Sequence, residues 1–233
     1  MMNGPFRAPI TIQLLLAVIG MAVLGSLGFG QEPTAAPVVE LKLSEWQYRV
    51  TTPVYEAIVA PSGLLSYLEV GHWRAAFLDR PLRLNVHPDR FGKKPQYICP
   101  RISQPEPDVL VCDGLQATLR YVFGRDSIEM TITAKRKHVD LFIPIKPEVD
   151  GVRIDHSEHG EQIAVGGRMV AGGGTIEYCL GGKFLRASGG VCNYAPTTLS
   201  APWIGAGEKK VVHLQMGDVT PEQRARFDIP RLY

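Results

Sequence analysis

Apolar residues occupy every second position through residues 117–145 more regularly than anywhere else in the chain. The pattern comes in three runs, separated by a turn at 124–127 and a charged break at 135–138. Side chains on a β-strand point to opposite faces with a period of two, so each run has one apolar face. Three such runs in succession predict an antiparallel meander with one buried face.

The same period recurs along the rest of the chain. Residues 55–59 and 64–70 flank Pro61-Ser62-Gly63 and predict a hairpin. In total about fourteen short strands are expected, with residues 193–207 left as a loop. Thr220 and Gln223 form a capping box around Pro221, which predicts one short C-terminal helix. The fold class is therefore all-β, a single large antiparallel β-sandwich.

Two stretches resemble the galactose-mutarotase-like family. Residues 55–57 (YEA) and 63–71 (GLLSYLEVG) look like its opening hairpin, and 119–123 (LRYVF) with 127–132 (SIEMTI) are similar to a central hairpin. The resemblance covers about a third of the chain and implies a supersandwich fold, found in mutarotases, glycoside hydrolases and polysaccharide lyases. It carries no catalytic residue over to this chain.

The N-terminal segment is typical of a secretory signal peptide. Arg7 is the only charged residue before Glu32, and residues 10–29 are almost wholly apolar. We expect a signal peptide at 1–30, a flexible leader at 31–37 and one β-sandwich domain at 38–233. The alternative is an uncleaved membrane anchor. We expect the protein to contact a membrane only through this segment, and only if it is not cleaved. The protein is then secreted, or lies in the periplasm or cell envelope.

Four cysteines fall into two pairs with equal spacing: Cys99 with Cys112, and Cys179 with Cys192. An even number of cysteines in an exported protein favours disulfides. Sequential pairing would close two short loops, each contributing about 3 kcal/mol. Four buried free thiols are the alternative, and no C-x-x-C spacing indicates zinc.

Charge and motifs exclude several classes of function. A net charge of +2 does not favour nucleic acid as a partner. The chain has no nucleophile elbow, P-loop, dinucleotide fingerprint or H-E-x-x-H motif. We therefore expect no cofactor and no metal, and a binding module rather than an enzyme.

Two polar clusters are candidates for chemistry. His87, Asp89 and Arg90 lie in one predicted loop, where a histidine and a carboxylate could act as base and acid on a sugar. An ordinary turn, with Asp89 bonded to the backbone, explains the same pattern. His156 and His159 form the second cluster, for which a solvated loop is the simpler interpretation.

Tryptophans are the candidates for sugar stacking, because an indole face offers an apolar platform to a pyranose. Trp73 falls in a strand pattern, which favours core packing. Trp203 follows Ala201-Pro202 in the predicted loop and is the better candidate for an exposed platform. Arg90 could add a polar contact to a bound sugar.

Three hypotheses follow. The first is an exported, non-catalytic β-sandwich that binds carbohydrate or an envelope protein. The second is a carbohydrate-active enzyme of the aldose-epimerase or polysaccharide-lyase-related type. The third is a purely structural envelope protein.

Overall fold

Strands make up most of the chain that the computed structural model describes, which is residues 38–42, 46–71, 75–87, 97–135, 137–156, 160–163, 174–195 and 198–227. These residues belong to one compact unit, Ala35–Tyr233. The predicted signal peptide and leader lie outside the described residues. No helix in the described ranges is both long and apolar enough to span a bilayer.

The largest sheet has nine antiparallel strands, in the order β13-β12-β14-β15-β18-β10-β9-β8-β7. At its centre the predicted hairpin of residues 117–134 is confirmed, with Ile128 opposite Phe123 and Ala134 opposite Ala117. The strands are β7 (Arg101–Glu106), β8 (Val109–Asp113), β9 (Ala117–Phe123), β10 (Ser127–Ala134), β12 (Gly151–His156), β13 (Gly160–Ile163), β14 (Gly174–Leu180), β15 (Lys183–Ser188) and β18 (Lys209–Asp218).

A five-stranded sheet follows chain order, β1 to β5. It contains the second predicted hairpin, in which Tyr55 pairs with Val70 and Ala57 with Leu68. Its strands are β1 (Val38–Lys42), β2 (Gln47–Thr51), β3 (Tyr55–Val59), β4 (Leu65–Val70) and β5 (Ala75–Ala76).

The third sheet has the order β16-β17-β11-β6 and corrects two predictions. β11 (Val139–Pro144) is the third apolar run, but it leaves the meander and pairs with β6 (Arg83–Val86) and β17 (Thr198–Ile204). The predicted loop at 193–207 is largely strand, β16 (Cys192–Ala195) and β17. Strand periodicity showed which face of each strand is buried, but it did not indicate the partner strand.

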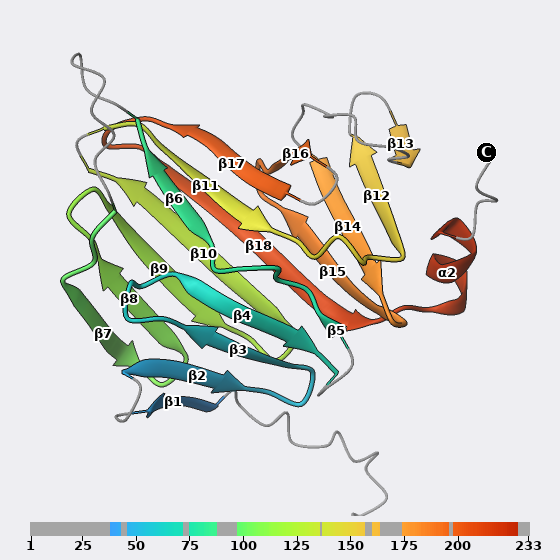
Figure 1. Cartoon of the computed structure of the whole chain (residues 1–233), viewed down its shortest axis with the longest axis horizontal. Helices are drawn as coiled ribbons and strands as arrows, with labels where there is room; N and C mark the ends of the chain where they lie inside the picture. Colours follow the sequence, from blue (N-terminus) through green and yellow to red (C-terminus); the bar gives the residue numbers. More distant parts are fainter. Residues whose placement is uncertain are drawn as a thin grey trace, which may run out of the picture. The chain divides into compact units, whose positions relative to one another are not determined.

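The two smaller sheets lie in front of the nine-stranded sheet in Figure 1, and one apolar core lies between the layers. Tyr55 on β3 donates its hydroxyl to the carbonyls of Gly124 and Ser127, at 3.0 and 3.1 Å. Tyr121 on β9 donates to the Gly63 carbonyl at 3.0 Å, so buried tyrosines tie the layers together. The all-β sandwich class is confirmed.

One short helix, α2 (Pro221–Phe227), follows the last strand, as predicted. The Gln223 N–H donates to Thr220 Oγ1 at 3.2 Å, and the Thr220 N–H donates to Gln223 Oε1 at 2.8 Å. These two bonds are the reciprocal pair of a capping box.

Candidate functional site

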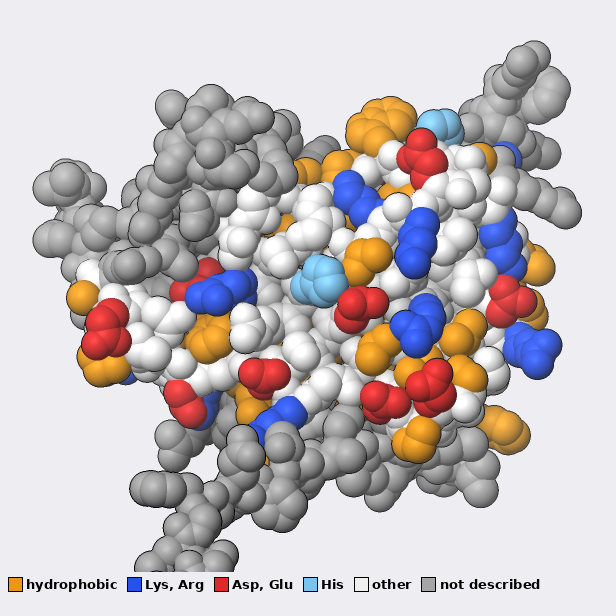
Figure 2. All heavy atoms as spheres, turned by 180° about the vertical axis from the view of Figure 1, so that it is seen from behind, with side chains coloured by type: hydrophobic (Ala, Val, Ile, Leu, Met, Phe, Trp, Pro, Cys, Tyr) orange, Lys and Arg blue, Asp and Glu red, His pale blue; other side chains and the backbone are white. Residues whose placement is uncertain are grey.

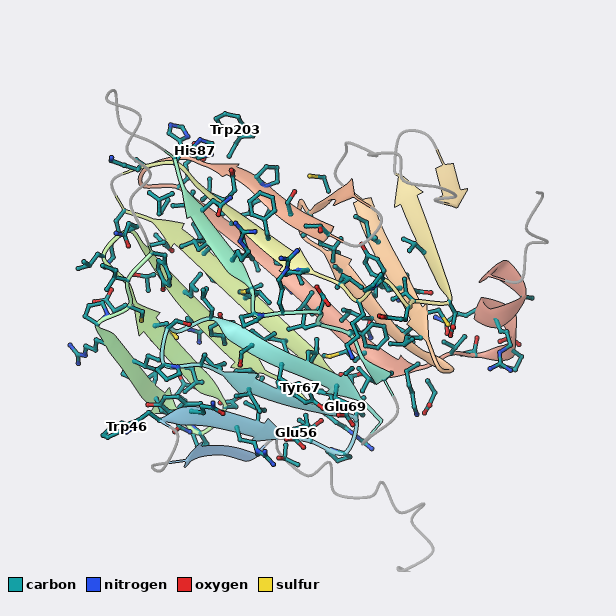
Figure 3. The ribbon with its side chains drawn as sticks, viewed as in Figure 1. Trp46, Glu56, Tyr67, Glu69, His87 and Trp203 are labelled. Atoms are coloured by element: carbon teal, nitrogen blue, oxygen red, sulfur yellow. The ribbon has the colours of Figure 1, made fainter. Side chains whose placement is uncertain are left out.

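Two histidines, an aspartate and a tryptophan meet at one end of the four-stranded sheet. Figure 3 shows His87 and Trp203 side by side there. His87 follows β6 and donates its N–H to the His138 carbonyl at 2.9 Å, which joins the end of β6 to the start of β11. Asp140 lies on β11 and Trp203 on β17, so three distant segments build the cluster.

A β-bulge brings Trp203 to this position. Val139 pairs with Ile204 and Leu141 with Ala201, so Pro202 and Trp203 together oppose Asp140. Proline has no N–H for the ladder and is confined in sheets to edges and bulges. An extra residue in a bulge bends the strand and redirects its side chains, often beside functional sites.

Asp140 uses both carboxylate oxygens within the cluster. Oδ2 lies 2.8 Å from His87 Nε2, and Oδ1 accepts the Trp203 backbone N–H at 2.7 Å. The Asp140 side chain is only 15% exposed and that of His87 28%. Asp140 therefore orients the imidazole through Nε2 and leaves Nδ1 as the other ring nitrogen for an incoming group.

The Trp203 indole is held outward in a strained backbone conformation. Its φ is +54°, in the left-handed region that costs a non-glycine residue about 1–2 kcal/mol. The side chain stays 69% exposed. The His87 ring stacks on the indole at 4.7 Å between centroids, and the His138 ring meets it edge-on at 6.3 Å. A large apolar ring is thus fixed in position and open to solvent.

A pocket continues from this cluster along the outer face of the same sheet. Its volume is about 310 Å³, at the lower end of the roughly 300–1,000 Å³ typical of small-molecule sites. On β6, Arg83 and Asn85 alternate with buried Leu84 and Val86, so they point outward. The lining residues are Arg80, Arg83, Asn85, Phe142, Pro144 and Thr198.

The sequence identified part of this site. His87 and Trp203 are brought together, whereas His156 ends β12 in the nine-stranded sheet, away from β6. Asp89, Arg90, Trp73 and His159 lie outside the described residues. Asp140 and His138, which flank the start of an apolar strand, were not predicted as site residues. The outward position of Asp140 on that strand was a signal, but its partners lie 53 and 63 residues away.

The cysteines are free thiols in the structure, so the predicted disulfides are not shown. Cys179 and Cys192 lie on strands of different sheets, β14 and β16, although they share a sequence spacing with the other pair. Cys99 and Cys112 do meet. A Cβ placed on Gly63 would lie 2.9 and 3.2 Å from their two sulfurs. Burial, then the neighbouring Cys99, raises the pKa of the Cys112 thiol well above its usual value.

Carboxylates also gather on the outer face of the five-stranded sheet, where Figure 3 labels Glu56, Tyr67 and Glu69. Glu56 pairs with Glu69 in register and binds Arg49 at 3.1 Å. Tyr67 donates its hydroxyl to Glu69. These groups bond mainly to one another, which suits a structural network. Trp46 directly precedes β2; it is 70% exposed and has a φ of +52°.

The face seen from behind in Figure 2, the outer face of the nine-stranded sheet, mixes acidic and basic side chains. On it, His213 Nδ1 lies 3.7 Å from Glu129 Oε2, and Arg186 binds buried Glu177 at 2.6 Å. Within the described residues, no group of three or more His, Cys, Asp or Glu side chains is arranged to hold a metal ion.

No protein-family model matches the chain, and no curated protein matches its sequence. Several solved structures are similar to it. A galactose mutarotase related enzyme from Lactobacillus acidophilus is 8% identical with a TM-score of 0.46, over 75% of this chain and 98% of that one. A candidate aldose 1-epimerase from Escherichia coli K12 is 9% identical with a TM-score of 0.44, over 74% and 99%.

The YidC insertase is also similar, at 12% identity and a TM-score of 0.44, over 93% of this chain and 48% of that one. The mutarotase-related neighbours agree with the family resemblance expected from the sequence.

Proposed function

We propose that this protein binds carbohydrate at Trp203, at one end of the four-stranded sheet. The observation that carries the proposal is how Trp203 is held. Its backbone is strained, its backbone N–H donates to the Asp140 carboxylate, and the His87 ring stacks on its indole. The indole is nevertheless open to solvent. Backbone strain of this kind concentrates at ligand sites, where the surrounding structure enforces it.

The chemistry beside the indole fits a sugar. A flat aromatic face packs against the C–H face of a pyranose, and polar groups around it bond the hydroxyls. Asn85 supplies an amide on the same sheet face, and His87 supplies a ring nitrogen. The site thus combines an apolar platform with donors and acceptors at its border.

The experiment is a titration of the protein with neutral oligosaccharides, in which binding is measured by tryptophan fluorescence and by calorimetry. We expect binding to be lost in Trp203→Ala, because the stacking platform is gone. Trp46→Ala is the matched control, since Trp46 is equally exposed and also has a positive φ. Equal binding by both variants, or no binding by the wild type, would reject the proposal.

A second candidate function is sugar epimerisation, and the His87–Asp140 pair favours it. A carboxylate that orients a histidine leaves the second ring nitrogen available as a general base. The His138 ring, 6.2 Å from that of His87, could serve as the acid. Polarimetry of α-D-galactose decides between the two candidates: mutarotation that is lost in His87→Gln supports the enzyme, and a rate equal to buffer rejects it.

We further propose that the protein is exported, loses residues 1–30 and closes a Cys99–Cys112 bridge in an oxidising compartment. The apolar N-terminal segment and the adjacent sulfurs support this. Intact-mass measurement of protein from the envelope fraction tests both points. The expected mass is that of a chain that begins at Gln31, less the two hydrogen atoms lost when the disulfide forms. In Cys112→Ser, Cys99 should become a free thiol that can be alkylated. A chain that keeps Met1, or four alkylatable thiols, contradicts the corresponding point.

A further inference from the structure

The pocket beside Trp203 is basic. Two of its six lining residues are arginines and none is acidic. Arg83 makes no ion pair with any residue in the described ranges. Arg80 has only a loose contact, 3.8 Å from its Nε to Asp79 Oδ2, with both side chains largely exposed. These two guanidinium groups are therefore available to an anionic ligand.

The arginines are held by the sheet rather than by a free loop. Arg83 lies on β6 opposite Phe142 of β11. Next to Arg80, the Asp79 N–H donates to the Pro144 carbonyl at 3.2 Å, which fixes this segment against the end of β11. Two cations thus flank the same pocket from two anchored segments.

The pocket and the Trp203 platform form one surface. Arg83, Asn85 and His87 follow one another at every second position, and Asn85 pairs with Asp140 across the sheet. At about 3.3 Å per residue, Arg83 and His87 are separated by about 13 Å. That distance is longer than one pyranose ring, so a ligand that reaches both contains more than one sugar unit.

We propose that the site takes an acidic oligosaccharide, in which one ring stacks on Trp203 and an anionic substituent, a carboxylate or a sulfate, binds Arg80 and Arg83. This inference rests on the proposed sugar-binding function and adds the chemical class of the ligand. Guanidinium groups bind such oxyanions through paired hydrogen bonds, which are stronger than neutral ones. Phe142 contributes an apolar wall to the pocket.

The test compares three ligands by calorimetry at low ionic strength: a hexuronate disaccharide, its carboxyl-reduced neutral form, and a sulfate ester of that neutral form. We expect the acidic ligands to bind about 10-fold more tightly than the neutral one, since hydrogen bonds to charged groups contribute about that factor. Added salt should reduce the difference in affinity between the acidic ligands and the neutral one. The two acidic ligands distinguish a carboxylate from a sulfate.

Arg83→Gln should remove about a factor of 10 from the affinity for the acidic ligands and leave the neutral one unchanged. Arg120→Gln, on β9 in the other layer, makes the same change in charge away from the site. Arg83→Lys keeps the positive charge but lacks the planar guanidinium group. Its affinity for the acidic ligands should lie between those of the wild type and Arg83→Gln. Thermal melts confirm that each variant is folded.

Two of the outcomes separate the two proposals. Equal affinity for acidic and neutral ligands overturns the acidic class and leaves sugar binding intact. Equal losses in Arg83→Gln and Arg120→Gln would show an effect of net charge alone and also overturn it. If none of the three ligands binds, both proposals fail.

Discussion

Asp140 is the residue on which the site depends. Its carboxylate orients His87, which directly follows β6, and fixes the backbone of Trp203 on β17. Its side chain is mostly buried, so its bond to His87 is shielded from water more than a surface pair would be. Loss of this side chain would release the imidazole and the bulge at once.

We predict that Asp140→Ala lowers the free energy of unfolding by about 1–3 kcal/mol, because it leaves the partners of two charge-assisted bonds unsatisfied. The same variant should lose sugar binding. Urea denaturation measures the first effect and fluorescence titration the second.

The control for this prediction is Asp113→Ala. Asp113 binds Lys135 at 2.7 Å but is 51% exposed, and exposed pairs contribute about 0–1 kcal/mol. A stability loss no larger than that of the control would show that the Asp140 bonds do not stabilise the fold.

Single residues also show which parts of the site could be predicted from the sequence. His87 was identified from the predicted loop that it shares with Asp89 and Arg90, and Trp203 because it follows Ala201-Pro202 in another predicted loop. Asp140 was missed because its neighbours Val139 and Leu141 read only as a strand. Pro202 within a β pattern was the local sign of the bulge that turns Trp203 outward.

At the scale of elements, local signals were the reliable ones. Both hairpins and the capping box of α2 formed as predicted, because each depends on residues close in sequence. The partner of β11 was not predictable in this way. Its alternation shows that Leu141 and Ile143 are buried, but the choice of β6 and β17 depends on long-range packing in the core.

For the whole molecule, the buried ionisable groups predict sensitivity to alkali. Burial raises the pKa values of Tyr55, Tyr121, Tyr178 and Cys112 well above their ordinary values of 10.0 and 9.0. The unfolded chain therefore releases these protons at a lower pH than the folded one. Their contribution to stability is complete below about pH 9 and is lost as the pH rises above it.

The measurement is the free energy of unfolding of the reduced protein, in which Cys112 is a thiol, in urea between pH 7 and about pH 11. We expect a steady fall above about pH 9, and a shallower fall in Tyr55→Phe, which lacks one of the raised groups. A stability that stays level through this range would mean that the buried tyrosines and Cys112 do not resist ionisation.

The order of the four-stranded sheet also sets when the site can exist during synthesis. His87 and Asp140 lie 53 residues apart, and Trp203 follows Asp140 by another 63. At ~5–20 residues per second, a ribosome needs roughly ten seconds between making the histidine and making the tryptophan. Throughout that interval the edge of β11 that β17 will cover stays unpaired on a nascent chain. A chain released before residue 198 would have the imidazole and the carboxylate, but neither the platform nor the strand that presents it.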